Sequence, residues 1–134
     1  MKTKFLPIYA LILLMAACSA PAALSAPSTQ TGYQMISVDD LHEHMQQDDL
    51  LLINVHIPWE GDIPGTHAAI PYNDIQSHLA QLPEDKSAPV YLYCRSDAMG
   101  HTAAQTLLDM GYRDVYNLQG GYIAWQAAGM PFGE

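Results

Sequence analysis

The sequence is poor in cysteine. Its 134 residues include only two, Cys18 and Cys94, and only Cys94 lies in the part of the chain that is expected to fold. A single thiol cannot form a disulfide within the domain. It also excludes an oxidoreductase of the thioredoxin kind, which needs a second cysteine nearby to resolve its mixed disulfide. His67, His78 and His101 have no partners at metal-ligand spacing, and metal binding by His42 and His44 is a poor second to a solvated helix face because i, i+2 does not align on a helix. No metal site is therefore expected.

Basic residues are also scarce. The chain has five Lys and Arg against fourteen Asp and Glu, and two of the five, Lys2 and Lys4, precede the folded part. Residues 33–134 keep three basic and fourteen acidic residues, a formal net charge of −11. Such a charge argues against nucleic acid and anionic lipid surfaces as partners. It also disfavours multiply charged anionic substrates unless the pocket itself is locally positive.

The N-terminal apolar run is too short to span a bilayer comfortably. It extends from Phe5 to Ala17, follows two lysines and ends in small residues, which is the pattern of an export signal. Its end, Leu14-Met15-Ala16-Ala17-Cys18, resembles the lipobox of bacterial lipoproteins, with Met15 where leucine is preferred. The resemblance implies that Cys18 becomes the lipidated first residue of the mature chain. Ser19 implies sorting to the outer membrane, so that the protein is anchored at the periplasmic face of the envelope.

Two other fates of this segment stay open. Cleavage after Ala20-Pro21-Ala22 would release a soluble exported protein without Cys18, and an uncleaved segment would act as an anchor. Residues 1–18 are thus interpreted as the signal. Residues 19–32, rich in Ala, Pro, Ser and Thr, have no apolar period and are predicted to be a disordered tether. Residues 33–134 then form one domain.

Strand and helix patterns alternate along this domain. Strands are predicted at 33–36, 50–55, 90–93 and 115–118, and helices at 38–47, 73–82, 99–110 and 122–128. Residues 56–72 are predicted to be a loop, and Leu79 is predicted to face inward on the second helix. Ser37 with Asp40 marks the start of the first helix, and Gly111 ends the third. The alternation predicts an α/β fold, an open parallel sheet of about five strands with helices on both faces.

Cys94 lies between a buried strand and a helix. Val90 to Tyr93 is the strand, and Met99, Ala103, Leu107 and Met110 recur at the spacing of one helix face. A cysteine in such a turn faces unpaired amides and the positive end of the helix dipole, and both stabilise a thiolate. The alternative is a buried cysteine that acts only as a small apolar side chain.

Four groups of residues together carry a family resemblance over nearly all of residues 33–134. They are Leu52-Ile53-Asn54-Val55 with Pro58-Trp59-Glu60; Ile63-Pro64-Gly65 with Ile70-Pro71; Val90-Tyr91-Leu92-Tyr93-Cys94-Arg95-Ser96; and Gly111-Tyr112 through Val115 to Leu118, Gly120-Gly121 and Ala124-Trp125 to Pro131. In this order they resemble a single rhodanese domain. Gly120-Gly121 alone would be a weak feature.

The resemblance implies a sulfurtransferase. Cys94 would be the nucleophile that takes sulfane sulfur from a donor such as thiosulfate, becomes a persulfide, and passes the sulfur to a thiol or another thiophilic acceptor. No other cofactor is implied. The cradle of backbone amides around the terminal sulfur would come from the loop Arg95, Ser96, Asp97, Ala98, Met99 and Gly100.

This loop departs from the family pattern Cys-Arg-Ser-Gly-x-Arg at two positions. Asp97 stands for the glycine and Met99 for the second arginine, so a cation is lost and a carboxylate is added beside the sulfur. Both changes predict slower thiosulfate chemistry. Asp97 is also a favoured helix N-cap, which would occupy amides that the persulfide needs. Met99 is expected to pack in the core, and Arg95 either faces the sulfur or turns to solvent.

A third departure is Asn54-Val55-His56 where the family often has Asp-Val-Arg, so that an internal charge pair is expected to be lost. His56 is interpreted as an ordinary loop histidine, and Trp59 and Trp125 as packing residues. His101, one turn into its helix, would at most add positive charge near Cys94.

Two other functions can be compared with sulfur transfer. A cysteine phosphatase needs an arginine where this chain has Gly100, which makes that class a poor match. A weakly catalytic or non-catalytic rhodanese module at the membrane is the serious alternative. It would bind a protein partner, for which the acidic surface favours a basic one, or sense oxidants through its one thiol.

Overall fold

The computed structural model describes residues 32–47 and 49–134. The predicted signal, the lipidation site Cys18 and the predicted tether up to residue 31 lie outside the described residues. Within them, no helix combines the length and the apolar character needed to cross a bilayer.

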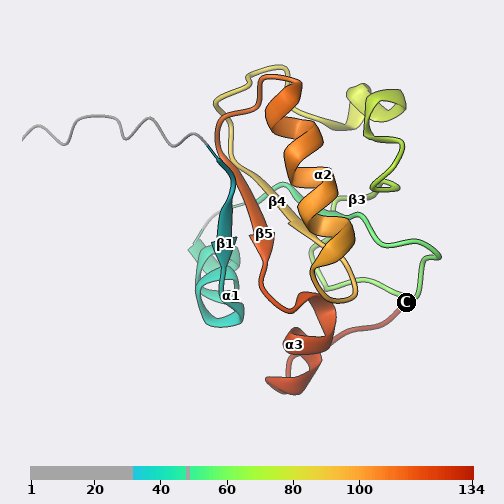
Figure 1. Cartoon of the computed structure of the whole chain (residues 1–134). Coiled ribbons are helices and arrows are strands. Elements are labelled where there is room, and N and C mark those ends of the chain that lie inside the picture. Colours follow the sequence, from blue (N-terminus) through green and yellow to red (C-terminus); the bar gives the residue numbers. More distant parts are fainter. Residues whose placement is uncertain (1–31, 48) are drawn as a thin grey trace, which may run out of the picture.

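Five parallel strands form one open sheet (Figure 1). In chain order they are β1 (Gln34–Ile36), β2 (Leu52–Asn54), β3 (Ala68–Ala69), β4 (Val90–Tyr93) and β5 (Val115–Leu118). Their order across the sheet is β1-β5-β4-β2-β3, and every neighbouring pair is parallel. The predicted α/β class and open parallel sheet are confirmed.

Helices cover both faces of the sheet, as predicted. They are α1 (Val38–Gln47), the 3-10 helix η1 (Ile75–Gln81), α2 (Ala98–Asp109) and α3 (Gly121–Ala127). One buried cluster joins the sheet to α2 and η1 through Leu92, Leu107 and Ile75. A second cluster on the opposite face joins it to α1 and α3 through Leu41 and Trp125. The strand residues of β4 alternate between the two clusters, which explains why the whole strand is apolar.

Local rules account for the ends of two helices. The Asp40 amide donates to Ser37 Oγ at 3.1 Å, and the Ser37 hydroxyl donates to the Asp40 carboxylate at 2.6 Å, which confirms the predicted start of α1. Gly111, with φ +94°, follows the end of α2, and its amide donates to the Leu108 carbonyl at 2.9 Å.

Some local predictions were wrong. β3 lies in the segment predicted to be a loop, because a strand of two alanines is too short to show a period. Leu79, predicted to face inward, is 53% exposed, because η1 is a 3-10 helix with a kink at His78. Trp59, predicted to pack in the core, is 48% exposed and donates from Nε1 to the Asp62 carboxylate, whereas Trp125 is buried as expected.

The parallel sheet brings the carboxyl ends of its central strands to one edge. Asn54 at the end of β2 pairs with Tyr93 at the end of β4, and the Val55 amide then donates to the Tyr93 carbonyl at 2.9 Å. His56 and Cys94 follow directly. β5 runs on to Gly120 and α3, which lies below this edge in the view of Figure 1. In such sheets this edge is where sites collect.

Candidate active site

Cys94 is held between the end of β4 and the first turn of α2. Its side chain is buried, with the residue 2% exposed, and the Gly100 amide donates to Sγ at 3.3 Å. Gly100 itself allows α2 to lie close to β5, since a Cβ at this position would meet Asn117 Oδ1 at 2.1 Å. The sulfur therefore contacts one of the unpaired donors at a helix N-terminus, where a negative charge is stabilised.

In the loop after Cys94, the backbone amides are unpaired, whereas the first carbonyls accept hydrogen bonds. In the described part of the chain, the backbone N–H groups of residues 95–99 have no protein acceptor. The Cys94 carbonyl accepts from the Tyr122 amide at 2.9 Å, and the Arg95 carbonyl accepts from the Ile123 amide at 3.2 Å. The first turn of α3 thus anchors the loop while its donors stay available for an anion.

Asp97 joins the loop to α3 and does not cap its own helix. Its Oδ1 accepts from the Gly120 amide at 2.8 Å, and its side chain makes no cap hydrogen bond to α2. The possibility that Asp97 would occupy the amides at the start of α2 is therefore wrong. Its φ is −140°, so this position does not need the positive φ that favours glycine.

Gly120 and Gly121 are part of the site, although the sequence singled them out only weakly. Both have positive φ, +75° and +58°. A Cβ on Gly121 would lie 2.3 Å from the Cys94 carbonyl oxygen and 2.5 Å from that of Arg95. Only glycine lets the start of α3 approach the loop this closely.

A carboxylate, Glu60, is the centre of a second group of side chains at the same edge. The Tyr122 hydroxyl donates a short hydrogen bond to Glu60 Oε2. His56 Nε2 lies 3.2 Å and Arg95 Nη1 3.9 Å from the same oxygen. The Tyr122 hydroxyl, with help from Arg95 and His56, lowers the pKa of Glu60. Burial and then the Glu60 carboxylate raise the pKa of Tyr122 to about 12.

His56 is not the ordinary loop histidine that the sequence suggested. It is 9% exposed, and its ring contacts the Tyr122 ring edge-on with centroids 5.6 Å apart. Its Nε2 faces Glu60, and its buried Nδ1 has no hydrogen-bond partner in the described structure. His56 thus lies against the Glu60 carboxylate, a contact that the sequence alone did not predict.

The other predicted residues have different surroundings. Arg95 turns to solvent, with a side chain 58% exposed, and its Nη1 lies 3.9 Å from Glu60 Oε2. Met99 packs against the core cluster, as predicted. Ser96 and Ala98 are exposed. His101 hydrogen-bonds through Nδ1 to the Tyr33 hydroxyl at the β1 edge.

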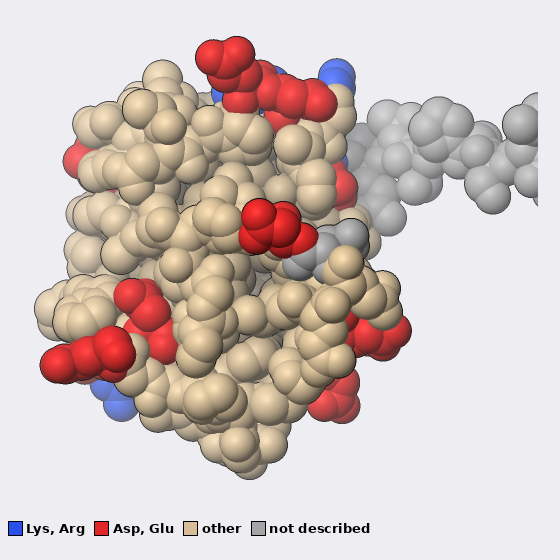
Figure 2. Space-filling view, turned by 180° about the vertical axis from the view of Figure 1, so that it is seen from behind, with Lys and Arg blue, Asp and Glu red and all other residues tan. Residues whose placement is uncertain are grey.

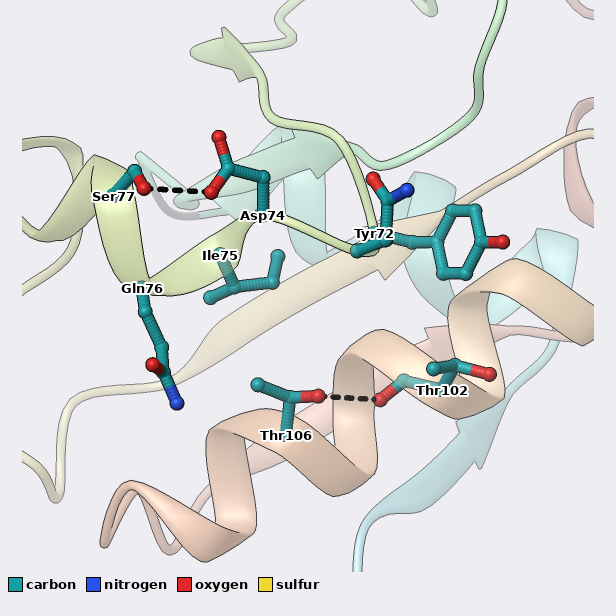
Figure 3. A pocket seen from close by; sticks show the side chains of 8 residues that line it. Tyr72, Asp74, Ile75, Gln76, Ser77, Thr102 and Thr106 are labelled. Atoms are coloured by element: carbon teal, nitrogen blue, oxygen red, sulfur yellow. Dashed lines mark hydrogen bonds between the residues drawn. The ribbon is translucent and has the colours of Figure 1, made fainter.

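A groove between η1 and α2 offers no comparable chemistry. It encloses about 350 Å³ and is lined by Tyr72, Asn73, Asp74, Ile75, Gln76, Ser77, Thr102 and Thr106 (Figure 3). Two hydrogen bonds join residues of its lining: Ser77 Oγ donates to Asp74 at 2.6 Å, and Thr106 Oγ1 donates to the Thr102 carbonyl at 3.0 Å. In the described residues, no cluster of three or more His, Cys, Asp or Glu side chains suits a metal ion.

Comparison with known proteins gives consistent matches. Residues 37–128 match the family model of the rhodanese-like domain. A sulfurtransferase of Allochromatium vinosum is 37% identical over 87 residues, which cover 63% of this chain and 78% of that protein. The thiosulfate sulfurtransferase GlpE of Pseudoalteromonas translucida is 27% identical over 99 residues, 72% of this chain and 91% of that protein.

Solved structures show the same fold. The crystal structure of a thiosulfate sulfurtransferase from Pseudomonas aeruginosa superposes with a TM-score of 0.66 at 19% identity. The match covers 76% of this chain and 20% of that one.

Proposed function

This chain belongs to the rhodanese-like family, and two of the relatives it resembles are named sulfurtransferases. We propose that it transfers sulfane sulfur through a persulfide on Cys94. One observation supports this most: Sγ accepts a hydrogen bond from the Gly100 amide at the start of α2, while the amides of residues 95–99 have no protein acceptor in the described chain. Such donors suit a thiolate and then the diffuse negative charge of a persulfide.

The proposed reaction is a two-step exchange. The Cys94 thiolate attacks the sulfane sulfur of the donor, the donor's S–S bond breaks, and the leaving group departs with the electron pair; for thiosulfate this is sulfite. Cys94 then carries a persulfide. A thiolate acceptor attacks the terminal sulfur, leaves as a new persulfide, and regenerates the Cys94 thiolate. Charge and electrons balance in both steps without a further cofactor.

The residues of the loop lead us to expect slow transfer of sulfur from thiosulfate. Met99, in place of an arginine, packs against the core, and Asp97 keeps a carboxylate at the start of α2. Arg95 is the one cation of the loop, and it lies near Glu60. A dianionic donor thus meets little net attraction beyond the backbone amides.

Intact mass after incubation with thiosulfate or a polysulfide tests this proposal. We expect an adduct of one sulfur atom that an excess of a small thiol removes, and that is absent from Cys94→Ser. Gln76→Ala, which alters an exposed residue of η1 outside the Cys94 loop, should still form the adduct. Absence of any adduct from several donors would contradict sulfur transfer.

One observation favours a second function. Cys94 is 2% exposed, as expected for a thiol that packs rather than reacts. The chain would then be a binding module, and its acidic surface would suit a basic protein partner. The mass experiment decides between the two, because a thiol sealed in the core forms no adduct with any donor.

We also propose that the protein acts at the periplasmic face of the bacterial envelope, held at the outer membrane by lipid on Cys18. Support comes from the export-type segment and the lipobox-like sequence that ends at Cys18. There the folded domain would meet a small sulfur donor and a thiol acceptor in an oxidising compartment.

A further inference from the structure

Glu60 is a partly exposed carboxylate, one oxygen of which contacts buried side chains. Its Oε2 accepts from the Tyr122 hydroxyl and lies 3.2 Å from His56 Nε2. These two partners are 5% and 9% exposed, whereas the Glu60 side chain is 41% exposed. Buried partners thus hold an ionised group at the surface, and their donation lowers the pKa of Glu60, so that it stays charged through the neutral range.

This fixed charge is connected directly to the Cys94 loop. Tyr122, which holds Glu60 by its hydroxyl, donates its backbone N–H to the Cys94 carbonyl at 2.9 Å. A negative charge on Cys94 also contributes to the raised pKa of Tyr122, so the sulfur lies within electrostatic reach of the Tyr122 hydroxyl, which in turn contacts Glu60. Arg95, the residue after Cys94, has its guanidinium 3.9 Å from Glu60.

The charges around the sulfur therefore do not sum to a positive site. Arg95 is the one cation of the loop, and it is opposed by Glu60 and by Asp97, whose carboxylate is fixed on the Gly120 amide. Met99 adds no charge. Each fixed carboxylate repels an approaching dianion twice as strongly as it repels a monoanion.

Resting on the proposed function, we propose that Glu60 determines donor specificity: by cancelling Arg95 it makes the site discriminate against dianionic sulfane donors such as thiosulfate and favour donors with at most one negative charge. Tyr122 and His56 act as positioning residues that hold Glu60. The proposal concerns which donor loads Cys94, and it assigns Glu60 no bond-breaking role.

An organic thiosulfonate, R–SO₂–S⁻, is the matching monoanionic probe. The Cys94 thiolate attacks its sulfane sulfur, the S–S bond breaks, and a sulfinate leaves with the electron pair. One negative charge on each reactant becomes one on each product. Thiosulfate reacts by the same bond changes but carries two negative charges and releases sulfite, so the two donors differ chiefly in charge.

The experiment compares the second-order rate constants for loading Cys94 with thiosulfate and with methanethiosulfonate, in the wild-type chain and in Glu60→Gln. Glutamine keeps the size and an acceptor for Tyr122 and removes the charge. We expect Glu60→Gln to raise the thiosulfate constant roughly three- to tenfold at low salt and the thiosulfonate constant less than about threefold. Glu84→Gln is the matched control, because Glu84 precedes β4 and follows Pro83, whose carbonyl accepts from the Tyr112 hydroxyl just before β5, so it lies toward the amino ends of these strands. It should change neither constant.

Two further measurements keep the test decisive if Glu60→Gln folds poorly. In the wild type, added salt should raise the thiosulfate constant more than the thiosulfonate constant, because it screens a repulsion. Tyr122→Phe, which frees Glu60 to move away, should shift the ratio of the two constants in the same direction as Glu60→Gln but less.

An unchanged ratio in both variants, with both donors loading Cys94, would overturn the specificity role and leave the proposed function intact. Loading by neither donor in the wild type would overturn both. A fall in the thiosulfate constant in Glu60→Gln would also contradict the proposal, since it would show that Glu60 assists the dianion.

Discussion

Asp97 shows how one side chain can have two opposed effects on the same site. Its carboxylate places a negative charge at the start of α2, which works against an anionic donor. The same carboxylate accepts from the Gly120 amide at 2.8 Å and so joins the Cys94 loop to α3. Restoring the family's glycine would remove both effects at once.

Asparagine separates the two effects. We expect Asp97→Asn, which keeps an acceptor for Gly120, to raise the rate of loading by thiosulfate roughly two- to fivefold with little change in stability. Asp97→Gly should lose about 1 kcal/mol of unfolding free energy, because the partly buried Gly120 amide loses its partner. Urea unfolding measures the unfolding free energy, and sulfite release measures the rate of loading by thiosulfate. If glycine proves both faster and as stable as the wild type, the link to Gly120 contributes nothing.

Single residues were predictable where the signal is local. Cys94 at the end of a strand and Met99 on the inner face of α2 follow from apolar periods in neighbouring positions. Glu60 and Tyr122 were not predicted as partners, because they are 62 positions apart and meet only when α3 packs below the carboxyl edge of the sheet. The possibility that Asp97 caps α2 was wrong for the same reason: its actual partner, Gly120, comes from a distant element.

At the scale of elements, α3 is the support of the candidate site. Its first turn donates two amides to the carbonyls of Cys94 and Arg95, and Gly121 allows this approach. Alternation of strands and helices predicted that such a helix exists after β5. It did not predict the contact, because periodicity places a helix on a face of the sheet and says nothing of which loop meets its first turn.

Gly121→Ala tests this support. The new Cβ would meet backbone atoms at 2.3 Å, which cannot move without displacing the Cys94 loop, and the φ of +58° adds strain. We expect a loss of at least about 2 kcal/mol of unfolding free energy and slower loading of Cys94 with every donor.

Gly129→Ala is the matched control for that change. Gly129 also has a positive φ, +79°, but nothing lies within 4 Å of its Cβ position. It should lose about 1 kcal/mol and load sulfur at the wild-type rate. Equal effects of the two variants on loading would show that the close approach of α3 is not what shapes the loop.

At the scale of the whole molecule, the charge decides how the domain meets a membrane. Acidic side chains are spread over the face seen in Figure 2, and few Lys and Arg lie among them. The folded part carries three basic and fourteen acidic residues. An anionic surface therefore repels the domain, and electrostatic attraction cannot hold it there.

If the chain is processed and lipidated at Cys18, its acyl chains must then supply the attachment to the membrane. We expect fatty-acid analogues to label the wild-type chain in cells but not Cys18→Ala, and the labelled protein to stay with membranes in high salt, because several acyl chains are not released by screening. Cys94→Ala should be labelled as the wild type is. Cys18→Ala should appear in the soluble fraction even at low salt. An unlabelled wild-type chain that is released by salt would contradict the lipid anchor, since attachment would then depend on charge despite the repulsion that the acidic domain predicts.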